Sequence, residues 1–380
     1  MTRALPLLAL YIHWPFCVSK CPYCDFNSHV RESVDQDRWR EALLADMAFE
    51  ASETASFRLS SIFFGGGTPS LMPPATVAAL IDAARHHWGF EPDIEITLEA
   101  NPSSVEAARF TDLAAGGVNR VSLGLQSLDD EALGFLGRAH SVAEGLAALD
   151  IAQRVFDRVS FDLIYALPGQ SEEAWQNQLT RALGFGTGHL SLYQLTIEQG
   201  TRFATLAAQG SLAKPDPDKG AVLYELTQAL TGQAGLPAYE ISNHARRGEE
   251  SRHNLTYWRY RPYAGIGPGA HGRRGNHATL RHRKPENWLA AIDRHGDGLQ
   301  SSDALSAEDR ALEALLMGLR LGEGIELSQL PARIIDRDAV AQMTAQGLLE
   351  AHGDRLTATP RGFLLLDAVL ARLVREGAPT

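Results

Sequence analysis

The first 200 residues alternate between short apolar segments and longer amphipathic ones, and this alternation constrains the fold more than any other feature. Six segments rich in Val, Ile, Leu and aromatic residues are predicted to be buried strands: Leu8–His13, Ser61–Phe64, Ile94–Leu98, Arg120–Leu125, Arg158–Ile164 and Leu190–Ile197. The segments between them have helical periodicity: Val34–Ser52, Ala75–His87, Val105–Ala115, Val142–Val155 and Ser171–Leu183. Strands that alternate with helices pair in parallel. The sequence therefore predicts an α/β fold, either a βα barrel or a doubly wound sheet.

Polar residues and glycines lie in each predicted strand or directly after it. In strand order they are Cys17–Cys24, Gly65–Pro69, Glu99–Pro102, Gln126, Asp162 and Tyr193–Gln194. In a βα barrel, the carboxyl ends of all strands meet at one face, where the active site lies. We therefore expect these residues to share one site at the mouth of a barrel.

The alternation fades after about residue 200, and a second unit is expected there. Residues 246–284 contain ten Arg or Lys against Glu249 and Glu250, a local charge of +8. Further on, amphipathic helices are predicted at Asp309–Leu321 and Arg361–Leu373, with a hairpin around Gly353. We expect a barrel domain of residues 1–235 and a C-terminal domain of residues 236–380 with a winged-helix-like end.

The overall charge and the cysteine content exclude several classes of protein. The formal net charge is −11, which argues against a nucleic-acid partner or an anionic membrane surface. No apolar run reaches the roughly 18 residues of a transmembrane segment. The chain has three cysteines, all within eight residues, which is a poor disulfide framework. Clustered thiols indicate metal chemistry in a reducing compartment, so we expect a cytoplasmic protein.

The cysteines are spaced as Cys17-x3-Cys21-x2-Cys24. A four-iron, four-sulfur cluster held by three cysteines keeps one iron free to bind a small molecule. The alternatives are a Cys3His zinc site completed by His13 or His29, and three structural thiols. Zinc sites usually take ligand pairs from two segments, and the sequence has no second pair. We expect His13 to organise the cysteine loop rather than to bind a metal.

The run from Tyr11 to Cys17, YIHWPFC, continues into Cys21-Pro22-Tyr23-Cys24. This pattern resembles the radical S-adenosylmethionine (SAM) superfamily, in particular its coproporphyrinogen-dehydrogenase-like branch, over essentially the whole chain. The resemblance implies a partial (β/α)6 barrel with a small C-terminal α+β domain. It also implies a [4Fe-4S] cluster near the barrel mouth and SAM bound to its free iron.

The resemblance implies a role for individual residues. Cys17, Cys21 and Cys24 would bind iron. The SAM pocket would contain Tyr11, Tyr23, Gly66, Gly67, Thr68, Glu99, Gln126, Arg138 and Asp162. Within it, Tyr23 would face the adenine, the Gly66–Thr68 segment the methionine amino group, and Glu99 the ribose. Arg138 would pair with the methionine carboxylate or with Asp162. The structural alternatives are that Glu99 caps the next helix, Arg138 forms a surface ion pair, and GGGTP is only a tight turn.

Two activities occur in this branch. One group oxidises the propionate side chains of coproporphyrinogen III, and the other, the HemW type, delivers haem to acceptor proteins. The enzyme's pattern continues as Gly-Cys after the third cysteine, whereas this chain has Asp25-Phe26-Asn27-Ser28-His29. The enzyme also has a long N-terminal extension, whereas 16 residues precede Cys17 here. Finally, residues 253–258, HNLTYW, match the HNxxYW signature of the chaperones. The resemblance therefore favours a haem chaperone without coproporphyrinogen dehydrogenase activity.

The HNxxYW segment could bind haem directly. His253 is the first candidate for the axial ligand and His271 the second. Four aromatic residues could cover the macrocycle: Tyr257, Trp258, Tyr260 and Tyr263. Five arginines could pair with its propionates: Arg252, Arg259, Arg261, Arg273 and Arg274. The alternative is that His253 and Asn254 satisfy backbone groups while Tyr257 and Trp258 fill the core. The expected partners are haem-accepting proteins such as membrane respiratory enzymes, and a second copy of the chain in a homodimer.

Overall fold

Six parallel strands form the wall of an open barrel in the computed structural model, which describes residues 5–331 and 334–374. In spatial order they are β1 (Leu7–Trp14), β4 (Arg58–Gly66), β5 (Phe90–Ala100), β6 (Arg120–Gln126), β7 (Arg158–Tyr165) and β8 (His189–Gln194). All six predicted strands are confirmed, and their order along the chain is their order in the sheet. Their carboxyl ends therefore lie along one rim, as the prediction of a common site requires.

Amphipathic helices pack around this wall because each has one apolar face to bury. The main ones are α1 (Gln36–Glu53), α2 (Pro74–Trp88), α6 (Val142–Val155), α7 (Glu172–Leu183) and α9 (Pro217–Gln233). Shorter helices follow the strand ends: α5 (Asp130–Phe135) and α8 (Arg202–Ala208). The single helix expected over residues 105–115 is wrong. The chain forms α3 (Ser104–Ala107) and α4 (Phe110–Ala115) instead, and Arg109 between them donates to the carbonyls of Ser70 and Leu71.

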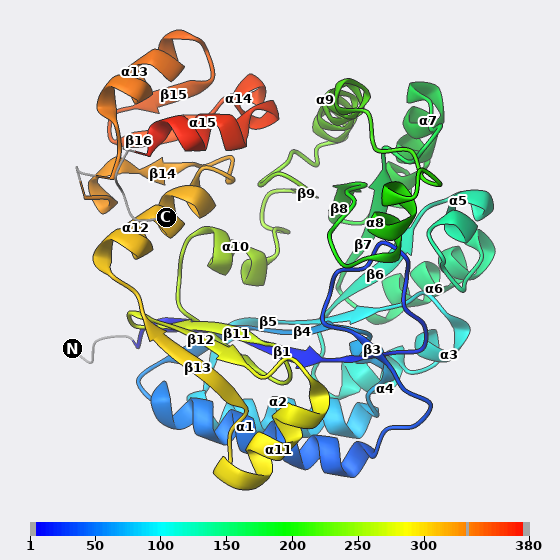
Figure 1. Ribbon diagram of the computed structural model, residues 1–380. Coiled ribbons are helices and arrows are strands. Elements are labelled where there is room, and N and C mark those ends of the chain that lie inside the picture. Colours follow the sequence, from blue (N-terminus) through cyan, green and yellow to red (C-terminus); the bar gives the residue numbers. More distant parts are fainter. Residues whose placement is uncertain (1–4, 332–333, 375–380) are drawn as a thin grey trace.

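The sheet continues beyond the barrel strands on both sides, giving eleven strands in the described residues. On the β1 side lie β10 (Tyr263–Ile266), β11 (His271–Arg274), β12 (His277–Arg281) and β13 (Leu299–Ala304). Strand β10 is parallel to β1, and the next three are antiparallel. On the other side, β9 (Asn243–Ala245) pairs with β8. Helix α10 (Arg252–Trp258) lies inside the curve of the sheet, and α11 (Pro285–His295) lies outside it (Figure 1).

A second hydrophobic core lies near the C-terminus. Its elements are α12 (Ala307–Gly318), β14 (Ile325–Glu326), α13 (Arg337–Ala345), β15 (Leu349–His352), β16 (Arg355–Ala358), α14 (Pro360–Leu364) and α15 (Leu366–Leu373). The predicted hairpin is confirmed as β15 and β16, with Gly353 in its turn. The helix expected at Arg361–Leu373 is divided at Leu365. Because residues 243–304 complete the large sheet and this core begins at Ala311, the expected boundary after residue 235 does not coincide with the division between the cores.

Candidate functional site

The three cysteines lie on the loop that follows β1, at the mouth of the barrel. The loop is closed by two short strands, β2 (Phe16–Cys17) and β3 (His29–Val30), which pair in parallel. All three thiols are free and partly exposed. Burial raises the pKa of Cys17 and of Cys24, so these thiols keep their protons at neutral pH until a metal centre replaces them.

Each sulfur has a polar neighbour from a different part of the chain. The Thr68 hydroxyl lies 3.5 Å from Cys17 Sγ, Arg138 Nη1 lies 3.2 Å from Cys21 Sγ, and Ser28 Oγ lies 3.8 Å from Cys24 Sγ. Hydrogen-bond donors around thiolates are typical of iron–sulfur sites, where they stabilise the anionic sulfurs. Arg138 Nε is also buried and has no hydrogen-bond partner in residues 5–331 and 334–374. Three soft sulfur ligands and a spare cationic donor fit a [4Fe-4S] cluster with one iron left open.

His13 fixes the shape of this loop. The Tyr11 hydroxyl lies 2.9 Å from His13 Nδ1, and His13 Nε2 lies 2.9 Å from the Asn27 carbonyl, to which it donates. Burial lowers the pKa of His13 to about 4, so the ring is neutral with both nitrogens in use. The expectation that His13 organises the loop is confirmed. No three His, Cys, Asp or Glu side chains in the described ranges converge on one point as ligands of a single metal ion.

Asn27 joins the cysteine loop to the C-terminal third of the chain. Its Nδ2 donates to the carbonyls of Pro268 and Arg283, each at 2.9 Å. Gly267 has φ +91°, and a Cβ there would lie 2.4 Å from the His13 carbonyl oxygen. Only glycine therefore fits between β10 and the cysteine loop. The sequence analysis did not find this contact, because its residues lie more than 200 positions apart.

A buried ionic network behind the loop supports Gly267. Asp46 of α1, which is fully buried, accepts hydrogen bonds from the amides of Gly267 and Gly298 at 3.0 and 3.1 Å. Arg281, also fully buried, pairs with Asp46 and with Glu50 at 3.4 and 2.6 Å. A buried arginine is tolerated when it is paired in this way. The network therefore fixes β12 and the Gly267 loop against α1.

Ion pairs with acidic residues also neutralise much of the basic stretch between residues 246 and 284. Its arginines meet acidic residues from elsewhere in the chain: Arg252 with Asp93, Arg259 with Glu323, and Arg274 with Glu50 and Glu53. The Arg273 guanidinium lies 3.6 Å from the centre of the Tyr260 ring and donates to the Arg261 carbonyl. Most of the arginines expected to face haem propionates thus already have partners within the protein.

The GGGTP segment at the end of β4 packs directly on the cysteine loop. The Gly67 amide donates to the Trp14 carbonyl, and the Thr68 amide to that of Phe16, at 2.7 and 2.8 Å. A Cβ on Gly66, whose φ is +113°, would lie 2.6 Å from the His13 ring, and one on Gly67 would lie 2.6 Å from the Phe16 carbonyl. Close contacts with the cysteine loop therefore require glycine at both positions, in agreement with the tight-turn alternative. Thr68 of the same segment reaches the Cys17 sulfur.

Two carboxyl groups face each other across the barrel mouth. Glu99 Oε2 accepts from the Gly66 amide at 3.3 Å, and Asp162 Oδ1 accepts from Ser122 Oγ at 3.3 Å. Burial and the charge of Asp162 raise the pKa of Glu99 to about 8. Burial raises the pKa of Asp162 to about 6. Glu99 does not cap the next helix, because the Ser103 hydroxyl does so. This alternative is therefore wrong.

Arg120 provides the positive charge nearest to this pair and was missed as a site residue. Its side chain is 3% exposed and donates to the hydroxyls of Thr97 and Ser160 at 3.4 and 3.1 Å. Its charge lowers the pKa values of both Glu99 and Asp162 against the effect of burial. The sequence signal for Arg120 is its place in a predicted strand, on the same face as the small residues Ser122 and Gly124.

Arg138 lies beside Cys21 rather than at the surface, so its surface ion-pair alternative is wrong. Its Nη2 donates to Asn101 Oδ1 at 2.6 Å and to the Gly124 carbonyl at 3.0 Å. It does not pair with Asp162. Gln126 adopts φ +65°, and its Nε2 occupies the space next to Gly124. Asn101, which also donates to Thr68, is a second site residue that the sequence analysis did not single out.

The two tyrosines expected beside SAM lie on opposite sides of the cysteine loop. The Tyr23 ring is 6.4 Å from that of Phe203 and faces Arg138. The Tyr11 ring is 6.3 Å from that of Phe63. Burial raises the pKa of each phenol, so both stay protonated at neutral pH. Tyr23, Arg138 and Thr68 are thus brought to the cysteines, whereas Tyr11 acts on them through His13.

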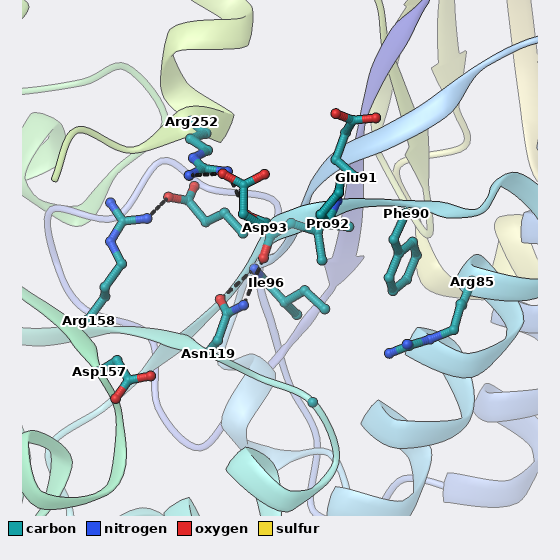
Figure 2. Close-up of a pocket in the computed structure, with 13 residues that line it drawn as sticks. Arg85, Phe90, Glu91, Pro92, Asp93, Ile96, Asn119, Asp157, Arg158 and Arg252 are labelled. Carbon is teal, nitrogen blue, oxygen red and sulfur yellow. Dashed lines mark hydrogen bonds and ion pairs between the residues drawn. The ribbon is translucent and has the colours of Figure 1, made fainter. Parts of the chain in front are cut away.

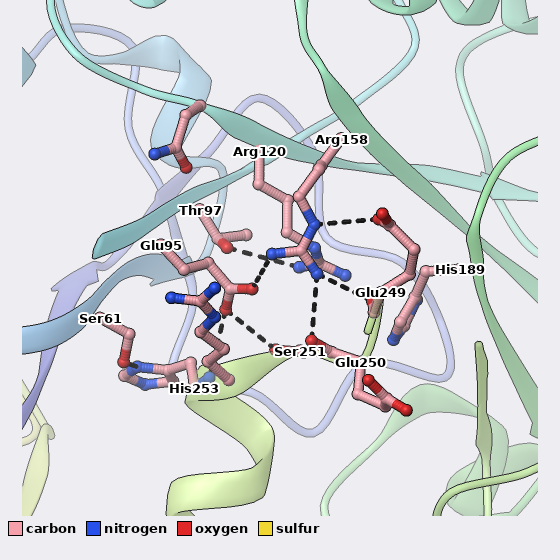
Figure 3. A network of polar contacts seen from close by, with 12 residues as sticks. Ser61, Glu95, Thr97, Arg120, Arg158, His189, Glu249, Glu250, Ser251 and His253 are labelled. Atoms are coloured by element: carbon pink, nitrogen blue, oxygen red, sulfur yellow. Dashed lines mark hydrogen bonds and ion pairs between the residues drawn. The ribbon is translucent and has the colours of Figure 1, made fainter. Parts of the chain in front are cut away.

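His253 belongs to a polar network at the other end of the barrel (Figure 3). Its Nδ1 lies 3.0 Å from Ser61 Oγ and its Nε2 lies 2.7 Å from the Tyr257 hydroxyl, and the side chain is 1% exposed. Glu95 accepts from the His253 amide at 3.2 Å and from Arg158 at 2.6 Å. Burial lowers the pKa of His253 to about 3. This arrangement leaves neither ring nitrogen free for haem iron and favours the structural alternative. We call Ser61, Glu95, Arg158, Ser251 and His253 the floor network.

A cavity of about 580 Å³ opens below the floor network, at the amino ends of the strands (Figure 2). It is lined by the start of β5, by Asn119 and Arg158, and by Arg252. Arg158 is engaged with Glu95 and Glu249, Arg252 with Asp93, and Arg85 lies over the Phe90 ring. The cavity is therefore at the opposite end of the barrel from the cysteines, and no cysteine lines it.

Comparison with known proteins agrees with this geometry. The model of the radical SAM superfamily matches residues 11–180, and that of the HemN C-terminal domain matches residues 305–365. The chain is 40% identical to mouse radical S-adenosyl methionine domain-containing protein 1, mitochondrial, over 97% of this chain and 87% of that protein. It is 37% identical to the heme chaperone HemW of Escherichia coli, over 98% of this chain and 99% of that protein. The heme chaperone HemW of Mycobacterium tuberculosis is 38% identical, over 96% and 94%.

Among solved structures, coproporphyrinogen III oxidase (HemN) from Escherichia coli, a radical SAM enzyme, has a TM-score of 0.82. It is 23% identical and the match covers 97% of this chain and 90% of that one, which shows the shared fold. The expected α/β fold with an open, partial barrel is confirmed. The chain belongs to the radical SAM superfamily and, within it, to the family that includes the heme chaperone HemW.

Proposed function

We propose that this protein is a haem chaperone that binds haem, a [4Fe-4S] cluster and SAM and delivers the haem to acceptor proteins. The observation that carries the proposal is the 37% identity to the E. coli heme chaperone HemW, which extends over 98% of this chain and 99% of that protein. The HNxxYW segment supports it, as does the Asp25–His29 sequence after the third cysteine.

The barrel mouth is the proposed site of the cluster and SAM. Cys17, Cys21 and Cys24 would hold the cluster, whose free iron would bind SAM and transfer an electron to it. Thr68, Ser28 and Arg138 would donate hydrogen bonds to the sulfurs. The protein part of the site thus fixes the thiolates and keeps Arg138 Nε available.

The remaining pocket residues would bind the organic part of SAM. Glu99, which is protonated at neutral pH in the ligand-free protein, can donate as well as accept a hydrogen bond to ribose hydroxyls. Asp162 and Arg138 would balance the charges of the amino acid moiety, and Tyr23 would cover the adenine. Gly66 and Gly67 would let the backbone approach the ligand closely, in addition to their contacts with the cysteine loop. Gln126 and Tyr11 would complete the wall.

The proposal includes the setting in which the protein works. The three free thiols support a reducing compartment, the cytoplasm. In residues 5–331 and 334–374, no helix has the length and hydropathy needed to cross a bilayer. The proposed acceptors are haem proteins such as membrane respiratory enzymes, and the proposed quaternary structure is a homodimer, which sedimentation of the purified protein tests.

The test is a pair of assays on the same cluster-loaded preparation. Haem is titrated by its Soret absorption, and coproporphyrinogen III is incubated separately with the protein, SAM and a reductant. We expect saturable haem binding and no protoporphyrinogen. Protoporphyrinogen formation without haem binding would replace the proposal with the dehydrogenase activity. Elemental analysis of the preparation should show iron, and one zinc without iron would overturn the cluster assignment.

A further inference from the structure

The cysteine loop carries an unusual amount of exposed apolar surface. Val18, Phe26 and Val30 are 70%, 59% and 46% exposed, and they are three of the nine large hydrophobic side chains exposed within the described ranges. All three lie within 13 residues of each other, and Cys17 pairs directly with Val30 in the β2–β3 ladder. Several exposed apolar side chains on one loop indicate an interaction surface.

A histidine lies on the same segment. His29 is partly exposed, and the one hydrogen bond of its ring within the described residues, from Nε2 to Asn27 Oδ1, is long at 3.3 Å. By contrast, His13 and His253 are buried and use both ring nitrogens. An imidazole that is accessible and weakly bonded can bind the iron of a haem.

Two cations and one carboxylate act on this histidine. Burial lowers the pKa of His29, the charges of Arg31 and Lys20 lower it further, and the charge of Glu286 raises it. Lys20 is exposed. Arg31 pairs with Glu286 at 2.5 Å, but both side chains are solvent-exposed, and such surface pairs are weak enough to exchange partners.

These three features complement the parts of a haem, which are a flat apolar ring, an iron that needs an axial ligand, and two propionates. We propose that haem binds on the outer surface of the cysteine loop, with His29 as its axial ligand. Phe26 packs on the macrocycle, and Lys20 and Arg31 face the propionates. This inference rests on the proposed haem-binding function and assigns it a place other than the HNxxYW segment.

The location also gives a role to the sequence that departs from the dehydrogenase pattern. Phe26 and His29 both lie in the Asp25–His29 segment, where the enzyme's pattern has Gly-Cys. Asn27 of the same segment is fixed by the carbonyls of Pro268 and Arg283. The loop can thus present Phe26 and His29 outward while its cysteines face the barrel.

The test is a haem titration of tag-free, cluster-loaded protein, followed by the Soret band, on wild type and six variants. His29→Ala should weaken haem binding at least tenfold and change the position of the Soret maximum, because the axial ligand is lost. His29→Met should restore part of the affinity with a different spectrum, because a thioether can also bind haem iron. Phe26→Ser and Lys20→Glu should each weaken binding severalfold. Val105→Ser, which changes an apolar residue 63% exposed elsewhere, is the matched control and should bind as wild type does.

The outcomes separate the site from the function. If wild type does not bind haem, the proposed function itself fails. If wild type binds haem and His29→Ala, Phe26→Ser and Lys20→Glu bind equally well, the function stands and this site is wrong. Iron and sulfide analysis accompanies each variant, and should His29→Ala lose its cluster, Phe26→Ser and Lys20→Glu decide the question. A changed Soret maximum in His271→Ala, together with an unchanged one in His29→Ala, would also overturn the assignment of His29 as the axial ligand.

Discussion

The mouth and the floor of the barrel contain the same kinds of polar residue but differ in how completely those residues are paired. At the floor, every nitrogen of Arg158 donates to an acidic residue or a carbonyl, and both nitrogens of His253 are bonded. At the mouth, Arg138 Nε has no partner among the described residues, and the Glu99 carboxyl has a pKa raised to about 8. Buried polar groups are normally satisfied, so missing partners indicate where a ligand binds. The floor holds the fold, and the mouth is prepared for a ligand.

Removal of one cysteine should break the mouth completely. Cys21→Ser replaces a soft thiolate with a hydroxyl that binds iron poorly, so the variant should lose the brown absorption of the reconstituted cluster and its bound iron. The floor variant Glu95→Gln, which changes a residue far from the cysteines, should retain both. Full-strength absorption in Cys21→Ser would show that this sulfur is not a ligand.

Removal of Glu95 should give the largest loss of stability at the floor. Glu95→Ala leaves Arg158 Nη1 and the His253 amide without their acceptor, and breaking a buried ion pair costs about 3–5 kcal/mol. Urea unfolding measures this change. The control is Glu91→Ala on the same strand, whose pair with Arg58 is solvent-exposed and should cost at most about 1 kcal/mol. Equal losses for the two variants would contradict the distinction between floor and surface.

Asn27 tests whether the mouth depends on the C-terminal third. Asn27→Ala removes two hydrogen bonds, each worth about 1 kcal/mol, between the cysteine loop and the segment 268–283. We expect the variant to fold and to lose its cluster to an iron chelator severalfold faster than wild type. Asn177→Ala, on the exposed face of α7, is the control. An unchanged rate of cluster loss would show that the loop does not need this connection.

The pH dependence of stability tests whether the pKa of the buried Glu99 carboxyl at the mouth is raised. The pKa of Glu99 is about 8 in the folded protein, whereas its ordinary value is 4.5. Between these two pH values the folded protein therefore holds a proton that the unfolded chain has released. Its contribution to stability is complete below pH 4.5 and is lost as the pH rises through 8. Wild type should therefore lose about 3 kcal/mol of unfolding free energy between pH 5.5 and 8.5 that Glu99→Gln, which cannot titrate, does not lose. Parallel curves in urea unfolding would contradict the raised pKa.

The smallest effect is expected outside both regions. Arg252→Met breaks an ion pair with Asp93 at the rim of the floor cavity, where the two side chains are 42% and 71% exposed. The unfolding free energy should change by at most about 1 kcal/mol. Haem affinity should not change, because the guanidinium faces Asp93 rather than a ligand. A large loss of haem affinity would return the haem site to the HNxxYW segment.

Much of the fold followed from local patterns in the sequence. The six strands were predictable because apolar alternation and strand-end residues are local signals, and parallel pairing then placed Cys17, Gly66 and Glu99 on one rim. The break at Arg109 was not predictable, because it depends on carbonyls of Ser70 and Leu71. The partners of the basic stretch were hidden for the same reason. Arg281 reads as a surface charge until the fold places Asp46 and Glu50 against it.

The bonds from Asn27 to the carbonyls of Pro268 and Arg283 have a consequence for the order of biosynthesis. They join residues 241 and 256 positions apart, so the loop that carries all three cysteines cannot reach its final shape while only the barrel strands have emerged from the ribosome. Iron and sulfide delivered to a nascent chain would meet an unfixed loop. We therefore expect the metal centre to be held more firmly once residue 283 has been translated.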